Sequence, residues 1–233
     1  MLAAIIVAAG SSRRMGFDKL LAPLAGKPLI AHTIEAFEIA ESVTEIILAT
    51  HENRRRELEE IARPMKKLRE IVVGGERRQD SVRAGLAYLS QRASYVAVHD
   101  GARPLIMPGE IERTFNAAQV HGAAALAEPI SDTLKRASAE LTVVESLDRD
   151  SLYAMQTPQV FRRTILEQAY GRVFQEEIHV TDEVSAVEHV GGKVVLVPGN
   201  EFNLKVTYQR DLQLADWILQ QRAKERRFPT GGF

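Results

Sequence analysis

The chain has 233 residues, and its 45% hydrophobic and 26% charged residues are typical of a globular protein that is large enough to bury one core. Its formal net charge of −1 argues against a general binder of nucleic acid or of anionic membranes, because such proteins carry a basic surplus. The sequence contains no cysteine, which excludes disulfides, thiolate nucleophiles and Cys-ligated zinc.

The first residues, LAAIIVA at 2–8, are apolar but lack a basic leader and a long hydrophobic segment. We interpret them as a strand rather than as a signal peptide. No apolar run approaches the roughly 20 residues that span a bilayer, so we expect a cytoplasmic protein with no membrane partner.

Short apolar runs alternate with helix-like stretches along the chain. The runs are rich in Val, Ile and Ala, as in strands that are covered on both faces, and they lie at 2–8, 45–50, 70–73, 95–99, 123–127 and 193–197. This alternation predicts βαβ units and a mostly parallel sheet flanked by helices, with ligands bound beyond the carboxyl ends of the strands.

Helices are predicted between these strands. One begins at Pro28, a charged and solvated helix covers 52–62, and another begins with Asp80 as its N-cap. Further helices are expected at 108–121, at 163–175, from 182 onward and at 211–223. We expect Trp217 to pack against the sheet and the run of arginines at 54–56 to form a solvated helix face.

Residues 131–156 break the alternation with charged and alternating segments around a polar turn. This pattern indicates a β-hairpin. Two interpretations are open: an arm that projects and pairs with another subunit, or an ordinary hairpin at the sheet edge. We predict one domain over residues 1–226 that includes this hairpin, followed by a tail at 227–233.

The loop after the first strand reads AAGSSRRMGFDK and covers residues 8–19. Its small residues Ala8, Ala9 and Gly10 allow backbone N–H groups to approach a ligand closely. Arg14 and Lys19 can then neutralise phosphate oxygens. The loop has neither the GxGxxG dinucleotide pattern nor the GxxxxGK[ST] phosphate pattern. By itself this segment is explained either by a triphosphate site or by a basic loop exposed to solvent.

Two later loops also follow predicted strands. GGERRQDSV at 74–82 places Gly75 and Ser81 where they can read a base edge, although a tight turn would explain it equally. VHDGARP at 98–104 places Asp100 where it can hold Mg²⁺ and Arg103 where it can contact an anion. We favour a functional role for this loop over a salt-bridged turn, because the acid and the cation share the carboxyl end of a strand.

The ordered set of loops resembles a known family. It comprises the three loops above and the later motifs SDTLKR (131–136), LDRDSLY (147–153), QTPQ (156–159), VTDE (180–183) and NLKVT (203–207). Over residues 2–217 the chain resembles the 2-C-methyl-D-erythritol 4-phosphate cytidylyltransferases. The resemblance implies a Rossmann-like nucleotidyltransferase fold, a homodimer joined through projecting arms, and Mg²⁺ as cofactor. It also implies transfer of a cytidylyl group from CTP to methylerythritol phosphate, with release of pyrophosphate, in the non-mevalonate isoprenoid pathway.

The resemblance also assigns roles to matching positions. Arg14 and Lys19 would stabilise the reacting α-phosphate, and Asp100 would lie beside the metal and the substrate. The nucleotide positions are Ala8, Ala9, Gly10, Gly75 and Ser81. The positions around methylerythritol phosphate are Arg103, Thr133, Arg149, Thr157, Thr181 and Lys205, of which Lys205 is also assigned to catalysis. Arg149 and Thr157 would come from the partner subunit.

The sequence departs from the family pattern at Ser12, where the loop usually carries a second glycine, and at Gly101, where alanine is common. Three alternatives are weighed against the family activity. The first is a cytidylyltransferase for another polyol phosphate, such as ribitol 5-phosphate. The second is a nicotinamide-dependent oxidoreductase, which the glycine spacing disfavours. The third is a non-catalytic nucleotide sensor, which would not need Arg103, Thr133 and Lys205.

Overall fold

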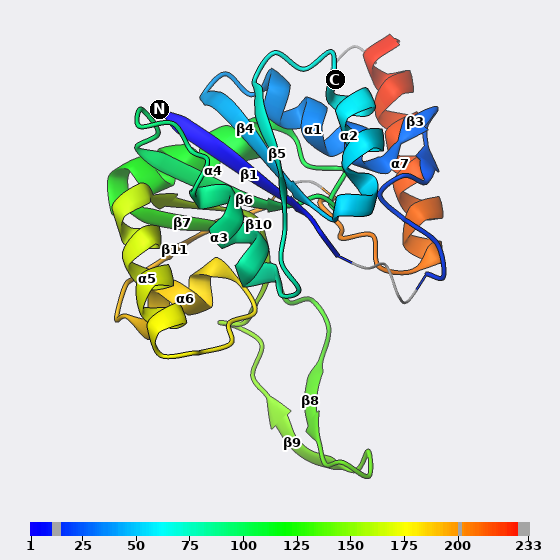
Figure 1. Ribbon diagram of the computed structural model, residues 1–233. Coiled ribbons are helices and arrows are strands. Elements are labelled where there is room, and N and C mark those ends of the chain that lie inside the picture. The colour runs from blue at the N-terminus through cyan, green and yellow to red at the C-terminus, as the bar shows by residue number, and fades with distance from the viewer. Residues whose placement is uncertain (11–14, 200–201, 228–233) are drawn as a thin grey trace.

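The computed structural model describes residues 1–10, 15–199 and 202–227, and a seven-stranded sheet lies at its centre (Figure 1). The strand order is β11-β7-β10-β6-β1-β4-β5. The strands are β1 (Leu2–Ala8), β4 (Val43–Thr50), β5 (Leu68–Val73), β6 (Tyr95–Asp100), β7 (Ala123–Pro129), β10 (Tyr153–Arg162) and β11 (Val195–Pro198). Two short strands, β2 (Pro23–Leu24) and β3 (Lys27–Pro28), pair separately.

The sheet is mostly parallel, as predicted. Strands β6, β1, β4 and β5 pair in parallel, as do β7 and β11, whereas β10 runs antiparallel to both β6 and β7. The sequence patterns missed β10, because Gln156, Thr157 and Gln159 interrupt its apolar run although all three are buried. These polar residues instead face the site described below, which explains the broken pattern.

Helices cover both faces of the sheet. In β1 the alternating residues Leu2, Ala4 and Ile6 belong to one hydrophobic cluster, while Ala3 and Ile5 belong to the other. This period of two is why the strand is apolar throughout. The first cluster includes residues of α1 (Leu29–Ile39), α2 (Arg55–Ala62), α4 (Pro108–His121) and α7 (Gln209–Arg227). The second includes residues of α3 (Arg78–Leu86), α5 (Arg163–Gln175) and α6 (Glu183–His189).

Three expectations about the helices were wrong. Helix α3 begins one turn earlier than predicted, with Arg77 as its N-cap, and Asp80 accepts a hydrogen bond from the Arg77 backbone N–H at 3.1 Å. The segment 52–62 is helical as predicted, as a short 3-10 helix η1 (Glu52–Arg54) followed by α2, but Arg54 is buried and not part of a solvated face. Trp217 is 58% exposed, because α7 turns Ala215 and Ile218 toward the core instead.

The hairpin is formed by β8 (Leu134–Ala137) and β9 (Val143–Leu147), and it projects away from the rest of the molecule (Figure 1). The predicted arm is therefore present, but residues 153–156 belong to β10 of the central sheet rather than to the arm. The apolar side chains of Leu141, Val143 and Val144 are exposed on it. Among the described helices, none combines the length and hydropathy that a membrane span requires.

His99 anchors the carboxyl end of β6 from inside the core. Its Nε2 lies 3.3 Å from the Arg103 carbonyl oxygen, which can only accept, so Nε2 carries the ring proton. Its Nδ1 then accepts from the Thr157 hydroxyl at 3.0 Å, and that hydroxyl oxygen accepts the Asp100 N–H at 3.0 Å. Burial lowers the pKa of His99 from 6.5 to about 3, so the ring stays neutral and holds the backbone around Asp100 in place.

This burial predicts a pH-dependent stability. Because the pKa of His99 is about 3 in the folded protein and 6.5 for a histidine free of these interactions, the unfolded chain binds more protons between these pH values. The free energy of unfolding should therefore decrease as the pH is lowered from 6.5, and His99 should contribute up to about 1.4 kcal/mol per pH unit to this decrease. Urea denaturation at a series of pH values above 5 measures this slope. His99→Gln should be less stable near neutral pH but show a shallower slope, and equal slopes in the two proteins would contradict the assignment.

Candidate active site

The carboxyl ends of β1 and β6 and the loop between β5 and α3 enclose a first cavity of about 230 Å³. The small residues of the opening loop and the glycine pair form part of its lining, together with Lys19. The structure thus brings together one group of sequence-predicted residues: Ala8, Ala9, Gly10, Lys19, Gly75 and Ser81.

The glycine pair permits the close contact between two of these loops. A Cβ atom on Gly74 would lie 2.7 Å from the Ala9 Cβ atom and 2.6 Å from Ser81 Oγ, so a larger residue would force the loops apart. A Cβ atom on Gly75 would clash with Asp80. Glycine is therefore required here by steric contact rather than by a positive φ.

A second cavity of about 210 Å³ adjoins the first. It lies beside the polar segment of β10, and its lining includes Gln156 and Gln159. Here the structure brings together a second group of predicted residues: Arg103, Thr157 and Thr181. Arg78, Asp100 and Lys205 line both cavities, and we call these three residues the shared wall.

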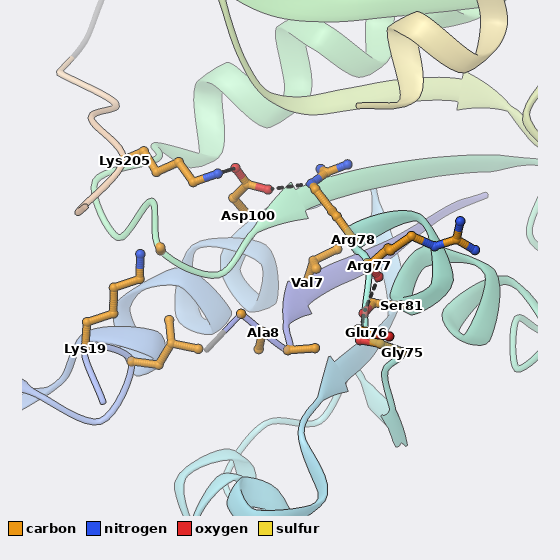
Figure 2. A pocket seen from close by; sticks show the side chains of 14 residues that line it. Val7, Ala8, Lys19, Gly75, Glu76, Arg77, Arg78, Ser81, Asp100 and Lys205 are labelled. Atoms are coloured by element: carbon orange, nitrogen blue, oxygen red, sulfur yellow. Dashed lines mark hydrogen bonds and ion pairs between the residues drawn. The ribbon is translucent and has the colours of Figure 1, made fainter. Parts of the chain in front are cut away.

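An ion cluster forms the shared wall. Lys205 Nζ lies 2.7 Å from Asp100 Oδ2, and Arg78 Nε donates to Asp100 Oδ1 at 3.1 Å; Figure 2 shows the two cations on either side of the carboxylate. Arg103 Nε is 3.9 Å from Asp100 Oδ2. Burial raises the pKa of Asp100, but the charges of Arg78, Lys205 and Arg103 outweigh burial and hold that pKa well below its usual value. Asp100 is therefore an ionised carboxylate within a net positive cluster.

Arg78 is the functional candidate that the sequence patterns missed. Its Nη1 donates to Glu183 Oε1 at 2.5 Å, and the Tyr170 hydroxyl donates to the same oxygen at 2.9 Å. Burial lowers the pKa of Arg78, but the negative charges of Glu183 and Asp100 raise it by more than burial lowers it. The guanidinium therefore keeps its charge. In the sequence, Arg78 lies within a polar run and has no periodic signal that separates it from its exposed neighbour Arg77.

The predicted arm residues lie apart from both cavities. Thr133 is exposed beside β8, and Arg149 donates to the Ser131 carbonyl oxygen at the base of the arm. Thr157, in contrast, belongs to the site of its own chain, because it bonds to Asp100 and lines the second cavity. The expectation that Thr157 comes from a partner subunit was therefore wrong. Arg14 and Ser12 lie outside the described residues.

At Gly101, the other departure from the family pattern, an added Cβ atom would lie 2.8 Å from Ile30 Cδ1. The side chain of Ile30 thus occupies the space that an alanine methyl group would need. The departure at this position is accounted for by packing against α1.

The carboxylates at the two cavities are few. The acidic residues in the lining are Glu76 in the first cavity and Asp182 in the second, together with Asp100, which lines both. Within the residues that the structure describes, no group of three or more potential metal ligands occurs. This arrangement does not form an all-protein metal cage. It fits a divalent ion that arrives with phosphate groups and takes one carboxylate from the protein.

Comparison with known proteins agrees with this geometry. The family model described as 2-C-methyl-D-erythritol 4-phosphate cytidylyltransferase matches residues 2–221. A protein of that name from Halalkalibacterium halodurans is 40% identical over 227 residues, which cover 96% of this chain and 98% of the relative. Another from Dehalococcoides mccartyi is 41% identical over 221 residues, which cover 94% of this chain and 96% of the relative.

Solved structures show the same relationship. The chain is similar to 4-diphosphocytidyl-2C-methyl-D-erythritol synthase from Anaerococcus prevotii, with a TM-score of 0.84 and 29% identity over 94% of this chain and 96% of that one. The 2-C-methyl-D-erythritol 4-phosphate cytidylyltransferase from Thermus thermophilus gives a TM-score of 0.78 and 28% identity, over 94% of this chain and all of that one. By its sequence, its fold and the order of its site loops, this chain belongs to the family of 2-C-methyl-D-erythritol 4-phosphate cytidylyltransferases.

Proposed function

We propose that this chain transfers a cytidylyl group from CTP to 2-C-methyl-D-erythritol 4-phosphate, forming 4-diphosphocytidyl-2-C-methyl-D-erythritol and pyrophosphate. Membership of the family supports this activity. The observation that carries the proposal is the shared wall, because a nucleotide cavity and a second substrate cavity meet at Arg78, Asp100 and Lys205. Two anionic reactants placed on either side of this wall are within reach of one another and of the same cations.

In the proposal, CTP occupies the first cavity. Ala8, Ala9, Gly10 and Gly75 offer close backbone approach to the nucleotide, with Ser81 beside them. Lys19 lies at the same cavity and is anchored by donating to the Val206 carbonyl oxygen at 2.8 Å. Arg14 is assigned to the same phosphates from the sequence alone.

The phosphorylated alcohol occupies the second cavity, next to Arg103, Thr181 and the Thr157 side chain. The Thr157 hydroxyl proton is already donated to His99, so Thr157 acts mainly by shaping the cavity and by holding the Asp100 backbone. Lys205 is partly exposed, and its flexible side chain can move from Asp100 to a bound phosphate.

A phosphate oxygen of the alcohol attacks the α-phosphorus of CTP in line, and pyrophosphate leaves from the opposite side. The nucleophile is already an anion, so the reaction needs no strong general base, which agrees with both ring nitrogens of His99 being occupied. The protein has to bring two repelling anions together and stabilise the charge that develops between them. A cation 4 Å from an anion contributes about 4 kcal/mol at an effective dielectric constant of 20.

We propose Mg²⁺ as the cofactor, held by the nucleotide phosphates and by Asp100. The single carboxylate of the shared wall is the donor set expected for Mg²⁺ that is bound chiefly through substrate phosphates. When bound, the ion would neutralise part of the triphosphate charge. The cytoplasmic location expected from the sequence remains a prediction.

We also propose a homodimer in which the arm of one subunit completes the site of the other. Thr133 and Arg149 match substrate positions of the family, yet they lie at the arm rather than at the two cavities of their own chain. The exposed apolar side chains on the arm supply a surface that a second copy of the chain would bury.

The activity is tested by pyrophosphate release with a panel of nucleotides and alcohols. CTP with methylerythritol 4-phosphate should be the preferred pair by at least about tenfold over CTP with ribitol 5-phosphate, as membership of the family implies. Preference for ribitol 5-phosphate would support the sister activity instead. Binding of CTP without turnover of any alcohol would indicate a sensor, and NAD binding would indicate an oxidoreductase.

Lys19→Ala tests the assignment of Lys19 to transition-state charge. We expect kcat to fall by about a hundredfold or more, with much smaller changes in both Michaelis constants, because the cation acts mainly on charge that develops during transfer. Steady-state kinetics with each substrate varied in turn measures this split. A variant whose sole defect is a raised Michaelis constant for CTP would show that Lys19 serves ground-state binding.

Mixing two impaired variants tests the exchanged arm. Arg149→Ala should weaken use of the phosphorylated alcohol while CTP binding survives. If Lys19→Ala and Arg149→Ala chains are unfolded and refolded together, each mixed dimer has one site with an intact Lys19 and an intact Arg149 from the other chain. Random pairing should then restore about a quarter of the wild-type activity. No recovery, in a mixture shown to contain mixed dimers, would place the arm at the site of its own chain.

A further inference from the structure

Arg54 lies beneath the opening loop and contacts both of its ends. Its side chain comes from η1, directly after β4, and the residue is only 5% exposed. Nη1 donates to the Ala8 carbonyl oxygen at 2.6 Å and Nη2 donates to the Gly10 carbonyl oxygen at 2.7 Å. Nε donates to Asp18 at the far end of the loop. One guanidinium group therefore holds both ends of the loop, to which Ala8, Gly10 and Lys19 of the first cavity belong.

We propose that Arg54 is a positioning residue for nucleotide binding. The inference rests on the proposed function, since the first cavity is the CTP site in that proposal. Arg54 acts through the loop backbone rather than by contact with substrate, and none of the family-derived assignments includes it.

The hydrogen bonds to Arg54 determine the direction of the loop carbonyl groups. In a trans peptide unit the C=O of Ala8 and the N–H of Ala9 point in opposite directions. Because Arg54 binds the Ala8 and Gly10 carbonyl oxygens, their partial negative charges are kept on the Arg54 side. The Ala9 N–H then faces away from Arg54. A loop whose donors and acceptors are sorted in this way suits an anionic ligand.

The contact with Asp18 extends the effect to Lys19. Asp18 also accepts the Leu20 N–H at 3.1 Å, so the backbone on both sides of Lys19 is held by the same carboxylate. Lys19 Nζ in turn donates to the Val206 carbonyl oxygen. The position of the cation assigned to the α-phosphate therefore depends in part on the Arg54 and Asp18 pair.

Arginine is specifically suited to this position. The planar guanidinium presents several donors in a fixed fork and can satisfy two carbonyl oxygens and a carboxylate at once. A lysine would keep the positive charge, but its single nitrogen atom cannot reproduce three donors held in that planar arrangement. Arg54→Lys therefore removes the geometry while it preserves the charge and much of the apolar stem.

The test compares Arg54→Lys and Arg54→Met with the matched control Arg56→Lys. Arg56 is two residues along the chain, its side chain is 89% exposed, and its Nε lies 3.9 Å from Glu60 Oε1. Kinetics are measured with CTP and methylerythritol 4-phosphate each varied, at a temperature where circular dichroism shows the variants as folded as the wild type. Arg54→Lys should raise the Michaelis constant for CTP about tenfold, the equivalent of losing one or two hydrogen bonds. The Michaelis constant for the alcohol should stay within about twofold.

Arg54→Met should increase the same defect, and Arg56→Lys should behave as the wild type. An unchanged Michaelis constant for CTP, or equal increases in both Michaelis constants, would overturn the inference. A fall in kcat alongside the raised Michaelis constant for CTP is expected, because the Arg54 and Asp18 pair also helps to position Lys19. If only Arg54→Lys folds, its ratio of the two Michaelis constants decides the question. Failure of the wild type to use CTP would instead reject the proposed function.

Discussion

The site depends on one buried carboxylate, Asp100, and the cations that surround it. An ionised carboxylate inside a protein is costly unless charges and hydrogen bonds compensate it, and here Arg78, Lys205 and Arg103 do so from different parts of the chain. Arg78 begins α3, Arg103 follows β6, and Lys205 lies between β11 and α7. The cluster thus joins segments that are far apart in sequence and at the same time forms the wall between two cavities.

The sheet brings these residues together. Parallel strands end at the same edge, so the loops after β1, β5 and β6 meet there although they are far apart in sequence. The antiparallel strand β10 adds further polar side chains, those of Gln156, Thr157 and Gln159, to the site. Thr157 and His99 then fix the backbone at Asp100 through one chain of hydrogen bonds. Each of these arrangements orders groups before a substrate arrives, which lowers the entropic cost of the reaction.

Much of the fold could be predicted from the sequence, because the apolar runs that become β1, β4, β6 and β7 are largely buried on both faces, and the edge strands β5 and β11 are partly buried and still apolar. The residues of the first cavity could also be predicted, since small residues and glycine pairs at strand ends have a steric reason to occur there. Strand β10 could not, because its polar residues serve the site rather than the core.

Two arginines show the other limit of sequence-based prediction. Arg54, which is buried, and Arg78, which is partly buried, each lie in a polar run beside more exposed arginines, and how far a given cation is buried depends on acceptors that are distant in sequence. Trp217 gives the converse case, because an aromatic residue on an amphipathic helix need not face the core. The origin of Thr157 within its own site likewise follows from strand pairing, which no local motif encodes.

The central claim is that two anionic substrates react directly across the shared wall. The most direct measurement uses CTP with a chiral sulfur substitution at the α-phosphate and determines the configuration of the cytidylyl product. Direct in-line attack by the phosphorylated alcohol predicts inversion at the α-phosphorus, because one displacement takes place. Retention of configuration would require two displacements through a covalent intermediate and would contradict the account.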